Sequence, residues 1–236
     1  MGMKKCAPAA LGYLLVVGIF LSGTWLGSRA VTAMAQRTPV ERSRTIVIDA
    51  GHGGEDGGAV SCTGVSEKQI NLETALRLND LLHLLGYRTR MIRSEDLSVY
   101  TEGQTIAQKK VSDLKHRVQM VNETDEPVLV SIHQNTFSDS RYSGAQVFYS
   151  ATAGSEDLAQ RLQKELIAAL TPGSNRKIKK AQGIYLMEHI TCPGILIECG
   201  FLSNPEEEAK LRTPEYQKKL CCVIGTALAD FLDGQT

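Results

Sequence analysis

The chain has 236 residues, which is enough for one domain of ordinary size together with a tail. Lysine plus arginine equals aspartate plus glutamate at 26 each, and hydrophobic residues make up 42% of the chain. This composition is that of a globular protein, and the balanced charge excludes the strong positive field that nucleic-acid-binding domains usually carry. A nucleic acid is therefore not an expected partner.

The first 35 residues differ in kind from the rest. Lys4 and Lys5 precede an uncharged, largely apolar run at residues 9–26. Such a run is an export signal or a membrane anchor, because signal-peptide cores have about 7 to 15 apolar residues and spanning helices about 20. The sequence AMA at residues 33–35 fits a cleavage site, while the length of the run favours an uncleaved anchor. In either case we expect the body of the protein outside the cytoplasm, with the membrane as a partner through this segment.

Residues 36–43 form a short polar linker, and strand-like and helical patterns alternate beyond it. Apolar runs predict strands at 44–49, 87–92, 127–133, 145–150 and 194–200. Periodic stretches predict helices at 66–86, 113–123, 155–170 and 214–232. Short apolar strands separated by helices are typical of a layered α/β domain with a largely parallel sheet, which we expect over residues 44–234.

The helix predicted at 66–86 has the clearest boundary signals. Ser66 is a favoured N-cap residue, Gln69 stands where it would complete a capping box, and Gly86 supplies the stop. Glu67 follows the cap directly, so the sequence places a carboxylate in the first turn of this helix.

Polar residues stand at the ends of three predicted strands. His52 comes after the first strand, His133 ends the third, and Glu198 lies near the end of the last. Because ligands gather at the carboxyl ends of parallel strands, we expect these side chains at one edge of the sheet. The glycine-rich stretch at residues 49–58 is not a phosphate-binding loop, since Gly-Lys-Ser/Thr occurs nowhere in the sequence.

A metal site explains these residues better than a phosphate site. Neutral imidazole and carboxylate are common zinc ligands, and a catalytic zinc usually has three protein ligands. His52 and His133 are two candidates, and either Glu67 or Glu55 could be the third, the latter in an H-x-x-E pattern. Glu198 stands among apolar residues, where an unpaired carboxylate would be costly to bury, so we expect it to face a polar cleft as a general base. The sequence thus predicts zinc-assisted hydrolysis of an amide or ester.

Six segments then point to a known family. In chain order they read IVIDAGHGGEDGGAV, SEKQINLETALRL, SIHQN, SGAQVFY, GIYLM and PGILIECGFLSNPEE. In this order and spacing they resemble the zinc-dependent N-acetylmuramoyl-L-alanine amidases of bacterial cell-wall remodelling, over about residues 44–234. The resemblance implies a single three-layer α/β domain with a central mixed, largely parallel six-stranded sheet flanked by helices. It also implies peptidoglycan as the substrate, cut between N-acetylmuramic acid and L-alanine.

The resemblance also assigns residues. It implies zinc bound by His52, Glu67 and His133, with Glu198 as the catalytic carboxylate, and so favours Glu67 over Glu55 as the third ligand.

Three further residues are weaker candidates for substrate contacts. Arg93 and Arg117 stand where the family often carries arginines, and they would either contact substrate carboxylates or brace the rim of the site through an ion pair. Asn135, two residues past His133, is expected to orient the rim or the substrate.

One branch of the family is more similar still, namely the germination-specific amidases of endospore-forming bacteria. The phrases SGAQVF, GIYLM and GFLSNP carry this similarity. It implies action in the spore cortex, on the forespore or cortex side, as a step towards muramic δ-lactam. The short segment after His133 leaves no room for the inhibitory helix of some division-associated members, so autoinhibition by that device is not expected. Whether an accessory protein takes part is left open.

Two other functions compete with this one. A zinc exopeptidase acting on stem peptides would need a group that binds a free terminus, for which Asn175 and Arg176 are candidates, although their turn is typical of a solvated loop. A non-catalytic wall-binding protein is disfavoured by the complete set of candidate catalytic residues. The six cysteines have no paired C-x-x-C spacing, which argues against a thiolate metal site and leaves a Cys62 to Cys192 disulfide open.

Overall fold

Residues 44–234 are the part of the chain that the computed structural model describes. The hydrophobic segment at 1–35 and the linker at 36–43 lie outside the described residues. Within the described part, no helix combines the length and the apolar character that crossing a membrane requires.

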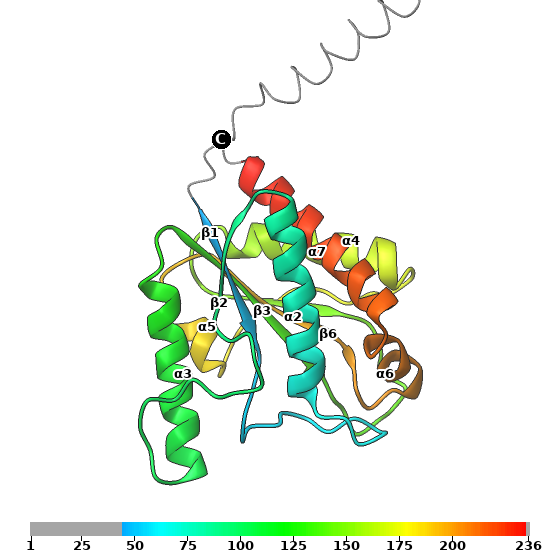
Figure 1. Ribbon diagram of the computed structural model, residues 1–236. Coiled ribbons are helices and arrows are strands. Elements are labelled where there is room, and N and C mark those ends of the chain that lie inside the picture. Colours follow the sequence, from blue (N-terminus) through cyan, green and yellow to red (C-terminus); the bar gives the residue numbers. More distant parts are fainter. Residues whose placement is uncertain (1–43, 235–236) are drawn as a thin grey trace, which may run out of the picture. The chain divides into compact units, whose positions relative to one another are not determined.

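Six strands form one mixed sheet in the order β2-β1-β3-β6-β4-β5 (Figure 1). The strands are β1 (Thr45–Ala50), β2 (Arg88–Met91), β3 (Pro127–Asn135), β4 (Gln146–Tyr149), β5 (Lys179–Lys180) and β6 (Gly194–Phe201). Strands β2, β1, β3 and β6 are parallel, β4 is antiparallel to β6, and β5 is parallel to β4. The prediction of a mixed, largely parallel six-stranded sheet is confirmed.

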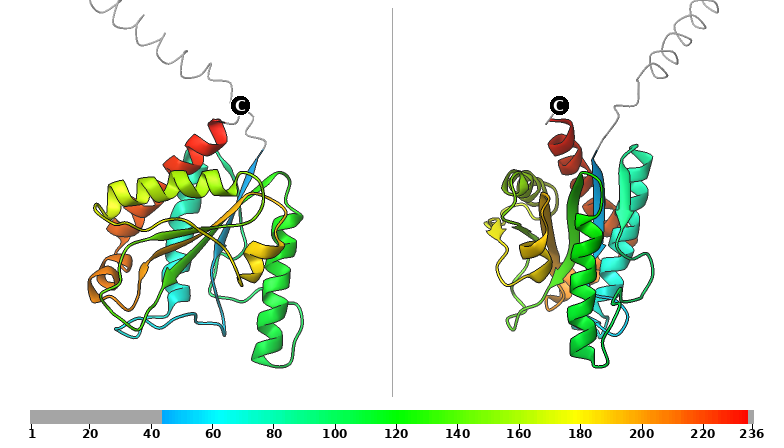
Figure 2. Two further views of the ribbon diagram at one scale, coloured as in Figure 1. Left: turned by 180° about the vertical axis from the view of Figure 1, so that it is seen from behind. Right: turned by 90° about the vertical axis from the view of Figure 1, so that its left-hand side faces the viewer.

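Helices cover both faces of this sheet. They are α2 (Glu67–Leu84), α3 (Ile106–Asn122), α4 (Ser155–Leu170), α5 (Tyr185–His189), α6 (Pro205–Leu211) and α7 (Pro214–Asp233). Side chains alternate along each strand, so Ile46 and Ile48 join the core formed with α2, α4 and α7, while Val47 joins the opposite core with α3 and α5. Helix α2 lies in front of the strands in Figure 1, and α3 and α5 lie in front in the reversed view of Figure 2. The domain therefore has the three layers that the sequence predicts.

The start of α2 differs from the prediction. Ser66 is the N-cap residue, but its side chain makes no capping hydrogen bond, so the predicted capping box is wrong. Instead the amide of Glu67 donates to the carbonyl of Ala59 at 2.8 Å, and the amide of Lys68 donates to the carbonyl of Gly57 at 3.2 Å. Backbone carbonyls of the glycine loop thus satisfy donors that a cap side chain would otherwise satisfy. The helix start is consequently fixed to the loop that precedes it.

A capping box forms instead at α3, where the sequence analysis did not expect it. The side chain of Thr105 accepts from the amide of Gln108 at 3.2 Å, and the side chain of Gln108 accepts from the amide of Thr105 at 3.2 Å. Helix α3 therefore begins at Ile106, seven residues before the predicted start at 113. Ile106 and Val111 are both exposed, so the first two turns have no buried apolar face for hydrophobic periodicity to reveal.

The cysteines of residues 44–234 are free thiols: Cys62, Cys192, Cys199, Cys221 and Cys222. Cys199, the neighbour of Glu198 in sequence, is fully buried in the core, and burial raises the pKa of its thiol well above the ordinary value. A buried thiol with a raised pKa is a poor nucleophile, so Cys199 acts as a core residue.

Candidate active site

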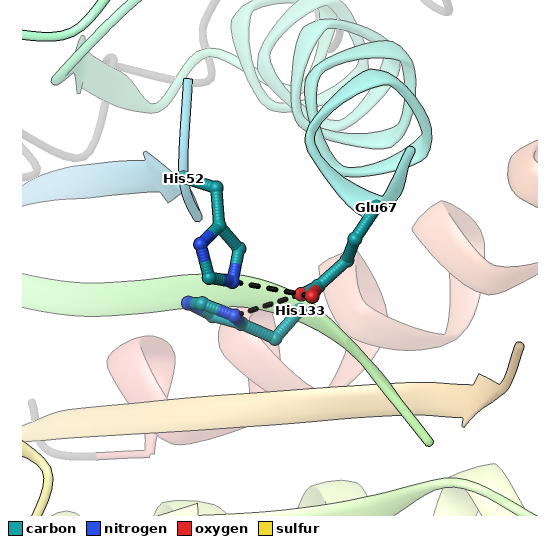
Figure 3. A group of neighbouring side chains, drawn as sticks. All are labelled: His52, Glu67 and His133. Carbon is teal, nitrogen blue, oxygen red and sulfur yellow. Dashed lines mark hydrogen bonds and ion pairs between the residues drawn. The ribbon is translucent and has the colours of Figure 1, made fainter. Parts of the chain in front are cut away.

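Three side chains from separate parts of the chain meet near the carboxyl ends of β1 and β3 (Figure 3). His52 follows β1, Glu67 begins α2 and His133 lies in β3. One carboxylate oxygen of Glu67 is 3.2 Å from Nε2 of His52, and the other is 3.0 Å from Nδ1 of His133. Atoms able to bind a metal ion, one from each residue, all lie within 4.8 Å of one another. The structure thus brings these three candidate residues into one group.

Glu67 is held by donors on several sides. Its side chain is buried, and it accepts hydrogen bonds from the amides of Ala59 at 2.9 Å and Gln134 at 3.1 Å, and from the side chain of Asn71 at 3.1 Å. Burial would raise the pKa of Glu67, but the hydrogen bonds and charges of the two neighbouring histidines outweigh it and hold that pKa well below its usual range. The carboxylate is therefore ionised and fixed in place.

His52 is held in an unusual backbone conformation. Its φ of 63° lies in the left-handed region, which side-chain-bearing residues seldom adopt. The other ring nitrogen, Nδ1, is 3.0 Å from Oδ2 of Asp56 across the tight turn that follows. A carboxylate at this position orients a metal-binding imidazole and leaves Nε2 to face Glu67. Asp56 was missed by the sequence analysis, although its place four residues after His52 in a glycine turn was an available signal.

Two buried arginines donate hydrogen bonds to the backbone around His52. Arg93 donates to the carbonyls of Ala50 at 2.8 Å and Gly51 at 3.0 Å, and Arg117 donates to the carbonyl of His52 at 2.8 Å. Each arginine is 3% exposed. The structure thus places both guanidinium groups on the backbone of residues 50–52, while contact with substrate carboxylates stays a prediction.

Arg117 also forms a buried ion pair with Asp49. Their nearest nitrogen and oxygen atoms are 2.5 Å apart, and Ser131 donates a further hydrogen bond to Asp49. Burial would raise the pKa of Asp49, but the charges of Arg117 and His133 and the hydrogen bonds from Ser131 and Arg117 together outweigh burial, so that pKa lies below its ordinary value. Both charges are therefore neutralised inside the protein.

Glu198 lies on β6 directly across from His133 of β3. Its Oε2 atom is buried without a hydrogen-bond partner, and burial raises the pKa of this carboxyl. Glu198, His52 and His133 together line a pocket of about 210 Å³. An unpartnered carboxylate with a raised pKa beside two imidazoles and a second carboxylate, that of Glu67, fits a general base at a metal centre.

The remaining candidates lie apart from this group. Glu55 is exposed and pairs with Lys109 at 3.0 Å, outside the cluster of His52, Glu67 and His133. The side chain of Asn135 accepts from the amide of the next residue at 2.8 Å and does not line the 210 Å³ pocket. Its role towards the substrate stays a prediction.

Two glycines make room for the side chains of His133 and Glu67. A Cβ atom on Gly51 would lie 2.2 Å from Cε1 and Nε2 of His133, closer than any side chain allows. Gly58 has a φ of 67°, and a Cβ atom there would lie 2.6 Å from the carboxylate of Glu67. The glycine loop can therefore pass beside His133 and Glu67 only without side chains at these positions.

These features define a class of protein, namely an α/β enzyme whose site contains a His, Glu and His group that could hold a metal ion. The family model for N-acetylmuramoyl-L-alanine amidase matches residues 46–230, and the chain belongs to this family. It is accordingly an N-acetylmuramoyl-L-alanine amidase, an enzyme of the hydrolase class.

Individual relatives agree with this assignment. The chain is 41% identical over 183 residues to the germination-specific N-acetylmuramoyl-L-alanine amidase of Bacillus subtilis, covering 77% of this chain and 76% of that protein. The CwlD amidase of Clostridioides difficile, solved in complex with the GerS lipoprotein, has a TM-score of 0.77 and 38% identity, covering 80% of this chain and 98% of that one. An N-acetylmuramoyl-L-alanine amidase from Clostridium difficile 630 has a TM-score of 0.72 and 29% identity, covering 83% and 100%.

The first prediction concerns the space beside His133. We expect Gly51→Ala to lose bound divalent metal, because the added Cβ would displace the imidazole ring. Gly57→Ala is the matched control in the same loop, since its Cβ would meet its nearest neighbour at 3.5 Å, an ordinary contact. The measurement is the metal-to-protein ratio after dialysis, and full metal retention in Gly51→Ala would contradict the prediction.

The second prediction concerns the buried pair of Asp49 and Arg117. Asp49→Asn leaves Asp113 as the remaining carboxylate partner of Arg117 and removes the buried one. We therefore expect it to lower the free energy of unfolding by about 1 to 3 kcal/mol at neutral pH. Because folding lowers the pKa of Asp49, its contribution is complete above the ordinary pKa of 3.8 and is lost as the pH falls through the folded-state value.

Urea unfolding of wild type and Asp49→Asn at about pH 7 and about pH 3 tests whether this contribution is lost in acid. The difference between wild type and Asp49→Asn should narrow in acid. Asp139→Asn removes an exposed partner of Arg141 and should leave stability unchanged at both pH values. If the difference in free energy of unfolding between wild type and Asp49→Asn widens in acid, or is absent at neutral pH, the buried pair does not stabilise the fold as predicted.

Proposed function

We propose that this amidase uses zinc held by His52, Glu67 and His133, and that it cleaves peptidoglycan outside the cytoplasm. The observation that carries the proposal is the convergence of two imidazole nitrogens and a carboxylate oxygen within 4.8 Å, beside the unpartnered carboxylate of Glu198. Two histidines and one glutamate are a donor set of catalytic zinc sites, which keep a further position open.

The chemistry is hydrolysis of an amide. When bound, zinc polarises the scissile carbonyl and lowers the pKa of a water molecule. Glu198 removes a proton from the attacking water as the oxygen bonds to the carbonyl carbon, and it passes that proton to the nitrogen as the carbon–nitrogen bond breaks. The products are the lactyl carboxylate of N-acetylmuramic acid and a stem peptide with a free L-alanine amino group.

Other residues of the chain keep these groups in position. Asp56 orients His52 through Nδ1, and the amide of Ala59 and the side chain of Asn71 orient the carboxylate of Glu67. Because burial raises the pKa of Glu198, its carboxylate is a stronger proton acceptor than an exposed glutamate. This combination of fixed ligands and a basic carboxylate supports the assigned roles.

We also propose that the enzyme acts in the spore cortex, where removal of stem peptides is a step towards muramic δ-lactam. The 41% identity to a relative named as a germination-specific amidase supports this role. The segment at 1–35 would export the enzyme or anchor it to the membrane. The similar Clostridioides difficile amidase was solved with a lipoprotein, which supports an accessory protein as a further partner.

The exopeptidase alternative gains no support from its candidate residue Arg176. That guanidinium donates to the carbonyl of Ser143 at 2.7 Å and to Gln146 at 3.2 Å, and it stacks 4.5 Å from the ring centroid of Phe201. Arg176 also does not line the pocket that contains Glu198.

The third prediction separates the base from the ligands. We expect Glu198→Gln to lower kcat on peptidoglycan by about 10² to 10⁴ while keeping its zinc, because glutamine has no carboxylate to accept the proton. His133→Ala should lose both zinc and activity. The measurements are the zinc content and the appearance of new L-alanine amino termini, and unchanged hydrolysis by Glu198→Gln would rule out its role. Release of terminal D-alanine instead would favour the exopeptidase.

The fourth prediction concerns the cortex. Spores made without this enzyme should have cortex peptidoglycan that lacks muramic δ-lactam, because peptides would remain on the muramic acid residues. Muropeptide analysis of purified spores measures this content, with a strain carrying Glu198→Gln as the matched control for loss of catalysis alone. Normal δ-lactam in both strains would exclude the cortex role.

A further inference from the structure

The first turns of α3 form one wall of the active-site pocket. Helix α3 extends past the ends of the strands, as Figure 1 shows at its lower end. Lys110 lies in these first turns, and it lines the same 210 Å³ pocket as His52, His133 and Glu198. The extension thus brings a cationic side chain to the pocket in which the proposed chemistry occurs.

Lys110 is the cation of this pocket that a ligand can reach. Arg117, the other cation in the lining, is buried and fully engaged with Asp49, Asp113 and the carbonyl of His52. The Lys110 side chain is 53% exposed, and its ammonium lies 3.3 Å from a carboxylate oxygen of Asp56, which is itself 32% exposed. An exposed ion pair of this kind is weak, so the ammonium can turn to a carboxylate that enters the pocket.

The helix turns that carry Lys110 are fixed in place by the local structure. The hydroxyl of Ser112 accepts from the amides of Thr101 at 3.0 Å and Glu102 at 3.1 Å. Asp113 accepts from the amide of Val99 at 2.7 Å. These contacts fasten the first turns of α3 to the loop at 99–102, so the helix presents Lys110 without further ordering.

We propose that Lys110 determines specificity by binding a carboxylate of the stem peptide, and this inference rests on the proposed function. The residue after L-alanine in a peptidoglycan stem is a D-glutamate linked through its side chain, which leaves its α-carboxylate free. Lys110 is separated from His52 by Asp56 alone, through contacts of 3.0 Å and 3.3 Å. That α-carboxylate lies about 7 Å from the bond to be cut, since each residue spans about 3.5 Å. The ammonium therefore stands within reach of this group.

A second role for Lys110 must be distinguished from this one. The same lysine could act through Asp56 on the orientation of His52, which would affect every substrate alike. A contact with the substrate carboxylate affects only substrates that carry it. The comparison of two substrates that differ at this single group therefore separates the two roles.

The experiment uses two muropeptides that are identical except at the D-glutamate α-carbon, where one has a carboxylate and the other a carboxamide. We expect Lys110→Met to lower kcat/KM about tenfold on the carboxylate form and to change it little on the carboxamide form. Lys110→Arg, which keeps the positive charge, should keep the wild-type preference for the carboxylate form. The zinc content of each variant is measured alongside and should not change.

Lys109→Met is the matched control, because it removes the same charge from the neighbouring position of the same helix. Lys109 pairs with Glu55, lies 5.0 Å from the ring centroid of Tyr100, and does not line the pocket with His52. Its substrate preference should equal that of the wild type.

Two results would overturn the inference. If kcat/KM of Lys110→Met falls equally on both muropeptides, or falls on neither, a contact with the carboxylate is excluded while the amidase function is left intact. Failure of the wild-type enzyme to cleave either muropeptide would overturn the proposed function and this inference with it.

Discussion

The carboxylate of Glu67 is the point at which the separate parts of the site are joined. A buried carboxylate is unstable unless hydrogen bonds and opposite charges compensate for the water it loses. Here the donors come from the glycine loop after β1, from β3 and from α2 itself, through groups of Ala59, Gln134 and Asn71. Because these donors must all reach one carboxylate, their positions relative to one another are fixed. The same requirement places the two imidazoles on either side of it.

Buried charges also hold the backbone around His52. His52 adopts a backbone conformation that costs about 1 to 3 kcal/mol for a residue with a side chain. Arg93 and Arg117 offset this cost by binding the carbonyls around it, and Asp49 neutralises Arg117 within the sheet. The histidine is therefore oriented by folding, and a metal ion bound by this group would not have to order the loop first.

Much of this arrangement could be predicted from local patterns in the sequence. Buried strands have continuous apolar runs, and parallel strands end at one edge, so His52, His133 and Glu198 could be grouped before any coordinates. The choice between Glu67 and Glu55 could not be made in this way, because it depends on how the loop folds back onto α2. Family resemblance favoured Glu67, and the structure places it between the two histidines.

Other features are hidden from such patterns for physical reasons. Strand β5 and helices α5 and α6 are too short for a hydrophobic period to emerge. The role of Asp56 depends on a tight turn that brings it back to the ring of His52. The N-terminus of α2 is satisfied by distant backbone carbonyls, whereas the sequence suggested a side-chain cap that does not form.

The first turns of α3 lie outside both hydrophobic cores, and their contacts are with a surface loop. Their length and composition can therefore change without disturbing the packing of either core. The chain thus separates the candidate catalytic residues, held by the sheet and α2, from a peripheral wall at the first turns of α3. Enzymes with the same core and the same His-Glu-His group can in this way differ in the peptides they accept.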